Sequence, residues 1–587
     1  MNLVFDIEAN GLDPTMIFCI VAMDVDTKEV YSFDIDNIVP GLKLLQGATK
    51  LIGHNIIGYD IPAIKKITGI DLATLKIVDT LVLSRLFNPT REGGHGLESW
   101  GYRLGFKKGD YGSSEGAWDA YTPEMLEYCI NDVKLNLKVY EVLKNKESKG
   151  FSGQSVKLEH LVASIINQQR VNGFLLDIKR CTLLVAELQE KIERVQAEVH
   201  EAFKPTITHT VLKPKYNKSG SLAKIASDPE GNGVRLTEEE YNLLCGGSEV
   251  VRISSVEFNL GSRKQIGEYL IRFGWKPKKH TPTGQPIVDE GALKKVKNIP
   301  EAAMIAQYLM LQKRIAQVKS WLKEVDEHTG RVHGYVNPNG AVTSRMTHSH
   351  PNMAQIPSAK SPYGPECRAC WIVPKGYKLV GIDASGLELR MLAHYMDDKG
   401  YTNDILNGDI HTTNQKLAGL ESRDQAKTFI YALLYGAGDA KLGTVVGGNR
   451  QAGKRLKQRF FSGLPSFTSL KTRVSREAAS GFVKTLDGRK LTVRSEHAAL
   501  NTLLQGGGAV VMKEALVIFN NKLQDKQINA KFAANVHDEW QLEVKEDQAE
   551  LVGELGVQAI REATCSLKLN CPLDGEYNVG DNWYETH

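Results

Sequence analysis

Four acidic residues near the amino terminus have the spacing expected of a shared metal site. Asp6 and Glu8 lie two apart in the apolar stretch LVFDIEA, and residues i and i+2 of a strand point to the same face. Asp60 follows in GHNIIGYDIPAI, and Asp132 lies four residues after Tyr128 in YCINDVKLNLKVY, on one face of a predicted helix. Four carboxylates suit two hard cations, Mg²⁺ or Mn²⁺. Two such ions generate hydroxide, orient a phosphate and stabilise a leaving oxygen, with Tyr128 available to position the attacking water.

A second pair of acids lies in the carboxyl-terminal half. Asp383 ends an apolar strand in KLVGIDASGLELRMLAHY, just before a helix-like run. The segment KFAANVHDEWQLEV predicts a β-hairpin with His537, Asp538 and Glu539 at its tip. Carboxylates at two strand ends are suited to bridge two Mg²⁺ (or Mn²⁺) ions, and Mg²⁺ leaves coordination positions for substrate phosphates. Asp383 and Asp538 therefore predict phosphoryl-transfer chemistry.

Between these acids, the segment RDQAKTFIYALLYGAG predicts a helix with one functional face. Arg423, Lys427, Tyr431 and Tyr435 follow one another at intervals of four residues, so they lie along one side of the helix. Two cations followed by two aromatic rings form a surface for a nucleotide, with charge for phosphates and rings for sugar and base. The other side is predicted to be packed because it is apolar: Phe429, Ile430, Leu433 and Leu434.

Each motif alone also has a structural interpretation. A single D-x-E is common, and a Lys/Arg ladder is usually a solvated helix face. The ordered set D-x-E, GHN-x₃-YD and Y-x₃-D, however, resembles the DEDD exonucleases, in the subgroup with tyrosine in the third motif. The resemblance implies a 3′→5′ exonuclease with a water-orienting tyrosine and two divalent metals. Its residues are Asp6, Glu8, Asp60 and Asp132 as ligands and Tyr128 for the water.

The later motifs, in the order Asp383, basic–aromatic helix, His537-Asp538-Glu539, resemble those of A-family DNA polymerases. The resemblance is close to the single-subunit replicative polymerases of short-tailed bacteriophages and covers nearly the whole chain except 204–257. It also rests on TSRMTHSHPNMAQIPS, HGLESWGYRLG and GRKLTVRSEHAALNTLLQGGGA. It implies primer extension with dNTPs on a DNA template.

The resemblance assigns roles to residues around the two acids. Asp383 and Asp538 would bind the catalytic metals together with the carbonyl of Ala384. The triphosphate would be held by three residues, of which Lys427 would also be the general acid for pyrophosphate: Arg423, Lys427 and His411. By itself, His411 in GDIHTTNQ would be interpreted as a helix-surface histidine.

Further roles concern the sugar and the primer. Glu388, braced by Tyr435, would exclude a ribose 2′ hydroxyl, and Tyr431 would face the sugar and confer tolerance of dideoxynucleotides. Minor-groove acceptors of the terminal base pairs would be read by Arg345 and Gln505. His537 would contact the primer terminus, and Glu539 would be supportive rather than an essential ligand.

The expected fold is α/β and multidomain. An RNase H-like (DEDD) exonuclease domain at 1–147 precedes a right-hand polymerase, with a polar boundary at 144–154. Helical stripes predict a thumb region at 148–333, with a short loop-rich insertion at about 204–257. Palm and fingers are expected at 334–587, with the fingers at about 400–480. No 5′ nuclease domain is expected.

Bulk properties agree with a cytoplasmic enzyme of several domains. The 587 residues carry a net charge of only +4, so a polyanion would be bound by local basic grooves rather than by an overall field. No run of eighteen apolar residues and no signal sequence is found. Eight dispersed cysteines suit a reducing compartment. The CxxC pair Cys367 and Cys370 supplies only half a zinc site, so buried thiols are expected.

The expected partners are primer-template DNA, dNTPs and a replicative helicase-primase, with the chain as a monomer. Phage relatives can carry a large basic thumb insertion that recruits thioredoxin. The stretch Lys204–Glu257 is short and carries few positive charges beyond Lys204, Lys213, Lys215, Lys218 and Lys224, which does not favour thioredoxin dependence. A nuclease that only binds DNA through its second half, and an inactive clamp, both conflict with the intact carboxylates. An RNA polymerase conflicts with Glu388 at the sugar position.

Overall fold

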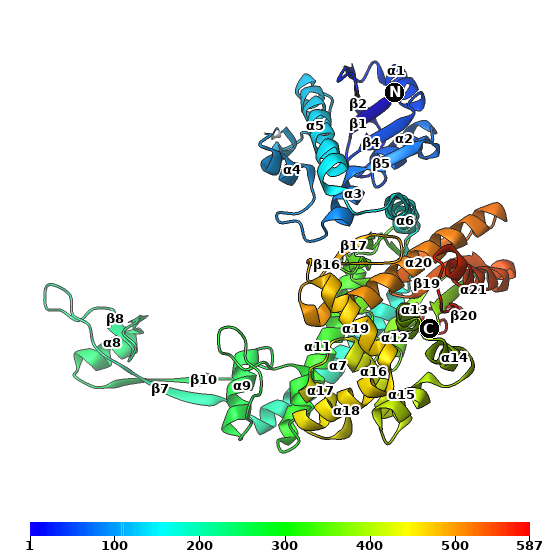
Figure 1. Cartoon of the computed structure of the whole chain (residues 1–587). Helices are drawn as coiled ribbons and strands as arrows, with labels where there is room; N and C mark the ends of the chain where they lie inside the picture. Colours follow the sequence, from blue (N-terminus) through cyan, green and yellow to red (C-terminus); the bar gives the residue numbers. More distant parts are fainter. Residues whose placement is uncertain (107–108, 110) are drawn as a thin grey trace. The chain divides into compact units, whose positions relative to one another are not determined.

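The computed structural model describes residues 1–106, 109 and 111–587 and divides the chain into two compact units (Figure 1). One unit comprises residues 1–177 and 324–587, and the other comprises 178–323. Helix α6 (Gly153–Asn172), expected in the thumb region, belongs to the first unit. The reason is a buried ion cluster, because Glu159 on α6 pairs with Arg489 and Lys513.

The amino-terminal part is built on a mixed five-stranded sheet of order β3-β2-β1-β4-β5. β1 pairs antiparallel with β2 and parallel with β4, and β4 pairs parallel with β5. The strands are β1 (Asn2–Ala9), β2 (Ile17–Asp24), β3 (Val30–Phe33), β4 (Lys50–Gly53) and β5 (Lys76–Asp79). The two apolar runs predicted as strands, LVFDIEA and IFCIVAMDV, are β1 and β2.

Helices cover both faces of this sheet. They are α1 (Ile38–Gln46), α2 (Asp60–Thr68), α3 (Thr80–Phe87), α4 (Leu97–Leu104) and α5 (Pro123–Val142). α5 begins with a proline after the capping residue Thr122, whose hydroxyl accepts a hydrogen bond from the helix. Val4 of β1 packs against Cys129 and Val133 of α5, whereas Leu3 packs with α1 and α2 on the other face. Because side chains alternate along a strand, Asp6 and Glu8 lie on the α5 face with Val4.

The second unit contains two long packed helices and a projecting ribbon. Helices α7 (Ile178–Ala202) and α11 (Pro300–Lys323) pack along each other. Between them lie β7 (Thr206–Leu212), β8 (Ile225–Ser227), β9 (Gly233–Arg235), α8 (Glu238–Cys245), β10 (Val250–Val256), α9 (Arg263–Arg272) and α10 (Glu290–Leu293). β7 and β10 form an antiparallel ribbon, with β8 and α8 beyond its end (Figure 1). The segment 204–257 therefore differs from the expected loop, because the β-branched runs TITHTVL and VVRISSV pair with each other.

The carboxyl-terminal part contains a four-stranded antiparallel sheet of order β18-β19-β15-β20. Its strands are β15 (Tyr377–Ala384), β18 (Lys531–Val536), β19 (Glu539–Lys545) and β20 (Gly575–Gly580). Smaller strand pairs flank it: β6 (Phe174–Leu176) with β11 (Arg331–Val332) and β14 (Trp371–Ile372), β12 (Tyr335–Asn337) with β13 (Thr347–Ser349), and β16 (Phe482–Lys484) with β17 (Lys490–Thr492). The predicted hairpin around residues 537–539 is thus present as β18 and β19.

Helices accompany this sheet, and all but the first of them contribute to one large apolar core with it. They are α12 (Gly364–Arg368), α13 (Leu387–Met396), α14 (Lys399–Asn407), α15 (Ile410–Ala418), α16 (Arg423–Leu434), α17 (Asp439–Gly443), α18 (Arg450–Gly463), α19 (Pro465–Ala478), α20 (Ala499–Asp525) and α21 (Ala549–Ser566). Among the described residues, Glu496–Asp525 alone is long and apolar enough to cross a membrane, and 78% of its most apolar window is buried, as in a core helix. Cys367 and Cys370 are buried thiols, as predicted.

Candidate active sites

The structure brings Asp383 and Asp538 together at the end of the carboxyl-terminal sheet. Asp383 is the penultimate residue of β15, and Asp538 lies in the turn between β18 and β19. The backbone N–H of Ala384 donates to the carbonyl of Asp538 at 3.1 Å. His537 adopts a left-handed φ of 57°, which few residues other than glycine adopt and which forms the tight tip of the hairpin. The two predicted acids therefore lie next to each other at this end of the sheet.

Partial burial favours the neutral, protonated form of these two carboxyl groups when no cation is near them. Burial raises the pKa of Asp383 to about 8, and the charges of Asp538, Glu539 and Glu576 add to the shift. Burial also raises the pKa of Asp538. Glu576, which the sequence interpretation missed, stands opposite Asp383 on β20 and is exposed. An oxygen-only set of clustered acids with raised pKa values is the donor chemistry that suits Mg²⁺ or Mn²⁺.

Glu539 is engaged by the carboxyl-terminal segment. One carboxylate oxygen accepts from the Gln541 amide at 2.6 Å and from the Trp583 indole, and the other lies 2.8 Å from Nδ1 of His587. Burial alone would raise the pKa of Glu539, but these hydrogen bonds together lower it. A Cβ at Gly381 would lie 2.2 Å from the carbonyl of Thr586, so glycine is required for this segment to pack on β15. Glu539 therefore accepts hydrogen bonds that hold the carboxyl-terminal segment in place.

The basic–aromatic ladder lies on α16 as predicted. Arg423 and Lys427 are exposed, Tyr431 is half-buried, and Tyr435 is the residue that ends the helix. Ser422 caps the helix through a reciprocal pair of hydrogen bonds with Gln425. The opposite side is buried in the core through Phe429, Ile430, Leu433 and Leu434. The helix therefore presents its ladder away from its packed face.

Glu388, at the start of α13, is held by two neighbours. The Tyr435 hydroxyl donates to both carboxylate oxygens, at 2.7 and 2.9 Å. The Arg345 guanidinium lies 3.4 Å from one of them. Burial and the Glu388 carboxylate raise the pKa of Tyr435, so its proton stays on the hydroxyl. The predicted bracing of Glu388 by Tyr435 is present in the structure.

The remaining polymerase-side candidates lie on neighbouring elements. His411 is in the first turn of α15, and its ring centroid is 6.3 Å from that of Tyr431. Burial and the nearby Arg423 lower the pKa of His411. Burial and Arg345 likewise lower the pKa of His537. Gln505 is half-buried on α20.

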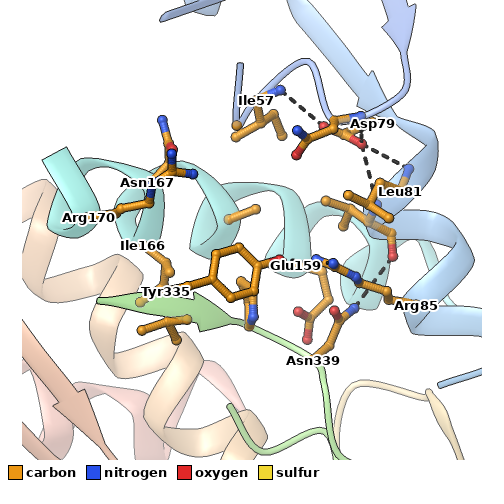
Figure 2. Close-up of a pocket in the computed structure, with 16 residues that line it drawn as sticks. Ile57, Asp79, Leu81, Arg85, Glu159, Ile166, Asn167, Arg170, Tyr335 and Asn339 are labelled. Atoms are coloured by element: carbon orange, nitrogen blue, oxygen red, sulfur yellow. Dashed lines mark hydrogen bonds between the residues drawn. The ribbon is translucent and has the colours of Figure 1, made fainter. Parts of the chain in front are cut away.

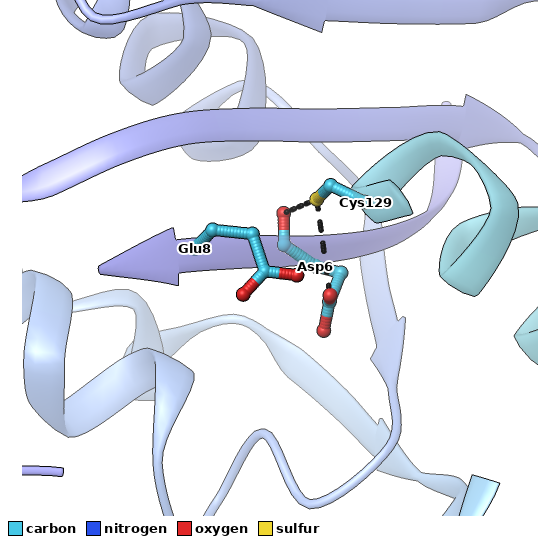
Figure 3. A group of neighbouring side chains, drawn as sticks. All are labelled: Asp6, Glu8 and Cys129. Atoms are coloured by element: carbon cyan, nitrogen blue, oxygen red, sulfur yellow. Dashed lines mark hydrogen bonds between the residues drawn. The ribbon is translucent and has the colours of Figure 1, made fainter. Parts of the chain in front are cut away.

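The amino-terminal site is centred on β1. Figure 3 shows the carboxylates of Asp6 and Glu8 side by side on this strand, with the thiol of Cys129 from α5 next to Asp6. The ligand atoms of these three side chains all lie within 4.8 Å of one another. The Cys129 thiol donates to the backbone carbonyl of Asp6 at 3.6 Å and lies 3.8 Å from its carboxylate. Burial raises the pKa of that thiol well above its ordinary value.

Cys129 was missed in the sequence, although its position next to Tyr128 in the third motif was a usable signal. Asp60 and Asp132, by contrast, do not belong to the 4.8 Å group within the described part of the chain. Both are buried, at 3% and 5% exposure. Asp132 nevertheless lies on α5, the helix that packs on the Asp6 face of β1.

Asp60 lies at the start of α2, where its carboxylate accepts the backbone N–H of Ile7 at 3.1 Å. Burial raises the pKa of Asp60 to about 7. Burial likewise raises the pKa of Tyr59 to about 12, with smaller contributions from Asp60, Glu8 and Asp6. The charges of Asp60, Glu8 and Asp6 all reach the Tyr59 hydroxyl, so these three predicted ligands lie around one point of the fold.

Tyr128 is half-buried within an aromatic cluster. Its ring centroid lies 5.8 Å from that of Tyr111 and 6.2 Å from that of Trp118. Both neighbours were missed in the sequence because they lie in the loop before α5, where no periodic pattern marks them. The cluster constrains Tyr128 next to Cys129 and one turn before Asp132.

A pocket lies between the loop that precedes Asp60, helix α6 and strand β12 (Figure 2). Its upper wall is organised by Asp79, whose carboxylate accepts the backbone N–H groups of Asn55, Ile57 and Leu81 at 2.9 to 3.0 Å. Figure 2 shows Asp79 and Ile57 joined in this way. Asp79 thus shapes the GHN segment, a role not apparent from its sequence context.

Comparisons with known proteins agree with this arrangement. The family model described as DNA polymerase family A matches residues 238–585. Over the full length of both chains, the sequence is 34% identical to the DNA-directed DNA polymerases of Enterobacteria phage T3 and of Escherichia phage T7. The structure is similar to the POL domain of Pol1 from M. smegmatis in complex with DNA primer-template and dNTP. The TM-score is 0.78 at 18% identity, covering all of this chain and 95% of that one, which shows a shared fold.

Proposed function

Since the chain belongs to DNA polymerase family A and is a DNA-directed DNA polymerase of the T7 and T3 type, we propose that Asp383 and Asp538 form its polymerase centre. The observation that carries this proposal is the meeting of the two half-buried acids at the Ala384–Asp538 hydrogen bond. Their carboxylates and the carbonyl of Ala384 would hold two Mg²⁺ (or Mn²⁺) ions. When bound, these ions supply charge that activates the primer 3′ hydroxyl and stabilises the leaving pyrophosphate.

The protein's own groups then position the nucleotide. Arg423, Lys427 and His411 line one side of α16 and the adjoining turn of α15, where they would bind the triphosphate. Lys427 would give its proton to the pyrophosphate. The solved relative, described as a complex with DNA primer-template and dNTP, supports the same substrates for this chain.

Sugar selection would depend on Glu388 and Tyr431. The Tyr435 hydroxyl fixes Glu388 by two hydrogen bonds, and the bulk of Glu388 would then occupy the place of a ribose 2′ hydroxyl. Tyr431 is half-buried. Burial contributes most to raising its pKa, and the charges of Glu388 and Asp538 add to the shift. Its hydroxyl would make the polar contact that a missing 3′ hydroxyl otherwise provides. Arg345 and Gln505 would read the minor groove, and His537 would contact the primer terminus.

We further propose a 3′→5′ proofreading exonuclease in the amino-terminal part. The mixed β3-β2-β1-β4-β5 sheet supports an RNase H-like fold, and Asp6 and Glu8 project from its central strand. Asp6, Glu8, Asp60 and Asp132 would hold two Mg²⁺ or Mn²⁺ ions, which supply a hydroxide nucleophile when bound. Tyr128, constrained by Tyr111 and Trp118, would orient the water.

In domain terms, residues 1–147 would be the exonuclease, and 334–587 the palm and fingers, with the fingers at about 400–480. The helices α14 to α19 occupy that last range. Of the expected thumb region at 148–333, residues 178–323 form a unit of their own and would be the thumb, whereas α6 would belong with the palm. Primer extension on a long template, with and without thioredoxin and with the helicase-primase added separately, tests the partner proposals. Unchanged product length with thioredoxin is expected, because the 204–257 segment is short and its basic residues are balanced by acidic ones.

The test of the exonuclease is the double variant Asp6→Ala/Glu8→Ala. It should lose Mg²⁺-dependent degradation of single strands and retain primer extension, because the two sites use different carboxylates. Residual degradation by the highly purified variant would contradict the assignment of the amino-terminal site.

A further inference from the structure

A carboxylate not assigned above connects two of the groups proposed to bind the triphosphate. Asp409 is the residue before α15, and its Oδ1 accepts the backbone N–H of His411 at 3.1 Å. Its Oδ2 accepts the Thr412 hydroxyl at 2.9 Å and the Nε–H of Arg423 at 2.6 Å. Asp409 therefore caps α15 and, at the same time, forms an ion pair with the first residue of α16.

The geometry of the ion pair leaves the functional edge of the arginine available. A guanidinium donates five N–H groups in a planar fork. Because Asp409 is hydrogen-bonded at Nε, the end-on edge formed by the two Nη groups is left for a phosphate, which that edge fits bidentately. The same carboxylate fixes the backbone of His411, so its position and that of Arg423 are coupled.

We propose that Asp409 is a positioning residue for the incoming triphosphate, which presents the Nη edge of Arg423 beside His411. This inference rests on the triphosphate role proposed for Arg423. Thermodynamically, a long arginine side chain loses considerable rotamer freedom when it binds a phosphate. An ion pair formed before substrate arrives means that part of this freedom is already lost, so binding is tighter.

An opposing effect of Asp409 is electrostatic repulsion of the triphosphate. Both members of the pair are about half exposed, at 53% and 41%, so the long-range effect of the Asp409 charge on a phosphate is screened by water. The short-range orientation of the fork is not screened in this way. We therefore expect positioning to outweigh repulsion, and the two effects predict opposite changes in dNTP affinity.

The test is Asp409→Asn in the full chain with Asp6→Ala/Glu8→Ala, which prevents excision. Asparagine is as good a helix cap as aspartate, so α15 is retained. The KM for dNTP should rise about five- to tenfold with little change in kcat, the loss expected for one partly exposed charge-assisted contact. The matched control is Asp424→Asn, which removes an exposed charge directly after Arg423 and should change KM less than about twofold.

Arg423→Ala separates this inference from the role on which it rests. Arg423→Ala should raise the KM, and Asp409→Asn should add nothing in that background. If Arg423→Ala leaves the KM unchanged, the triphosphate role fails and the inference fails with it. If Arg423→Ala raises the KM, three results overturn the inference alone. These are a KM that falls in Asp409→Asn, a KM that does not change, and an effect that persists without Arg423.

Discussion

The buried ion cluster that connects α6 to the polymerase core provides a sharp test of how the first unit is stabilised. Glu159, Arg489 and Lys513 are all at most 2% exposed. Glu159 accepts from the Lys513 ammonium at 2.6 Å and from Arg489, which is also bonded to Asp487. Glu159→Gln therefore leaves Arg489 with one carboxylate, but removes the one ion-pair partner of Lys513 among the described residues.

Removing one member of a buried pair costs about 3–5 kcal/mol, because a charge is left uncompensated in a medium of low dielectric. Burial already lowers the pKa of Lys513 to about 8, so loss of its proton limits the cost at neutral pH. We therefore expect Glu159→Gln to lose about 3 kcal/mol, the lower end of that range. Adding Lys513→Met should recover at least about 1 kcal/mol, because it removes the stranded cation.

The assay is urea unfolding followed by near-ultraviolet circular dichroism, with the midpoints of the variants compared at pH 7. The matched control is Glu141→Gln, which breaks the pair with Lys28 at about half exposure and should cost less than about 1 kcal/mol. If Glu159→Gln unfolds at the same midpoint as the control, or if Lys513→Met brings no recovery, the reasoning about buried charge is refuted.

Three further predictions concern the catalytic groups. Glu388→Ala should raise the efficiency of rNTP relative to dNTP incorporation at least about tenfold, because the carboxylate braced by Tyr435 no longer occupies the 2′ position; an unchanged ratio in single-nucleotide kinetics would rule out the gate. The wild type should accept ddNTPs almost as well as dNTPs, and Tyr431→Phe should restore discrimination by about 1–3 kcal/mol, measured without excision; strong rejection by the wild type would contradict this. Burial raises the pKa of Asp383 from 3.8 to about 8. When a chelator removes metal ions, the stability that the protonated Asp383 carboxyl contributes is therefore complete below pH 3.8 and is lost as the pH rises to about 8. Between pH 3.8 and 8, the melting temperature of Asp383→Asn should decline less than that of the wild type, and Mg²⁺ should remove this difference. If the two proteins show parallel curves of melting temperature against pH in chelator, Asp383 does not have the raised pKa.

Much of each site could be predicted because its residues follow local periodicities. Asp6 and Glu8 share a face because a strand alternates, and the Arg423–Tyr435 ladder lies along one helix because four residues advance slightly more than one turn. Asp538 was predictable from the hairpin pattern around it. In each case, the geometry is contained in a segment of fewer than about fifteen residues, within the length of an ordinary helix or hairpin.

What could not be predicted depends on pairing between distant segments. Glu576 stands opposite Asp383 only because β20 adds to β15 in the observed register. The engagement of Glu539 by His587 requires the chain terminus to fold back on β15. The 204–257 ribbon was missed because its two β-branched strands are separated by about forty residues of polar sequence, and neither strand shows a clear alternation by itself.

The most direct test of the account is the activity of Asp538→Asn in the full chain. The substitution keeps the size of the side chain and removes one negative charge at the hairpin tip, where Ala384 contacts Asp538. Primer extension should fall by at least about a thousandfold, since a metal-dependent step loses several kcal/mol of charge stabilisation. Degradation of single strands from the 3′ end should continue at the wild-type rate. Extension by Asp538→Asn at a rate close to that of the wild type would contradict the assignment of Asp383 and Asp538 as the polymerase centre.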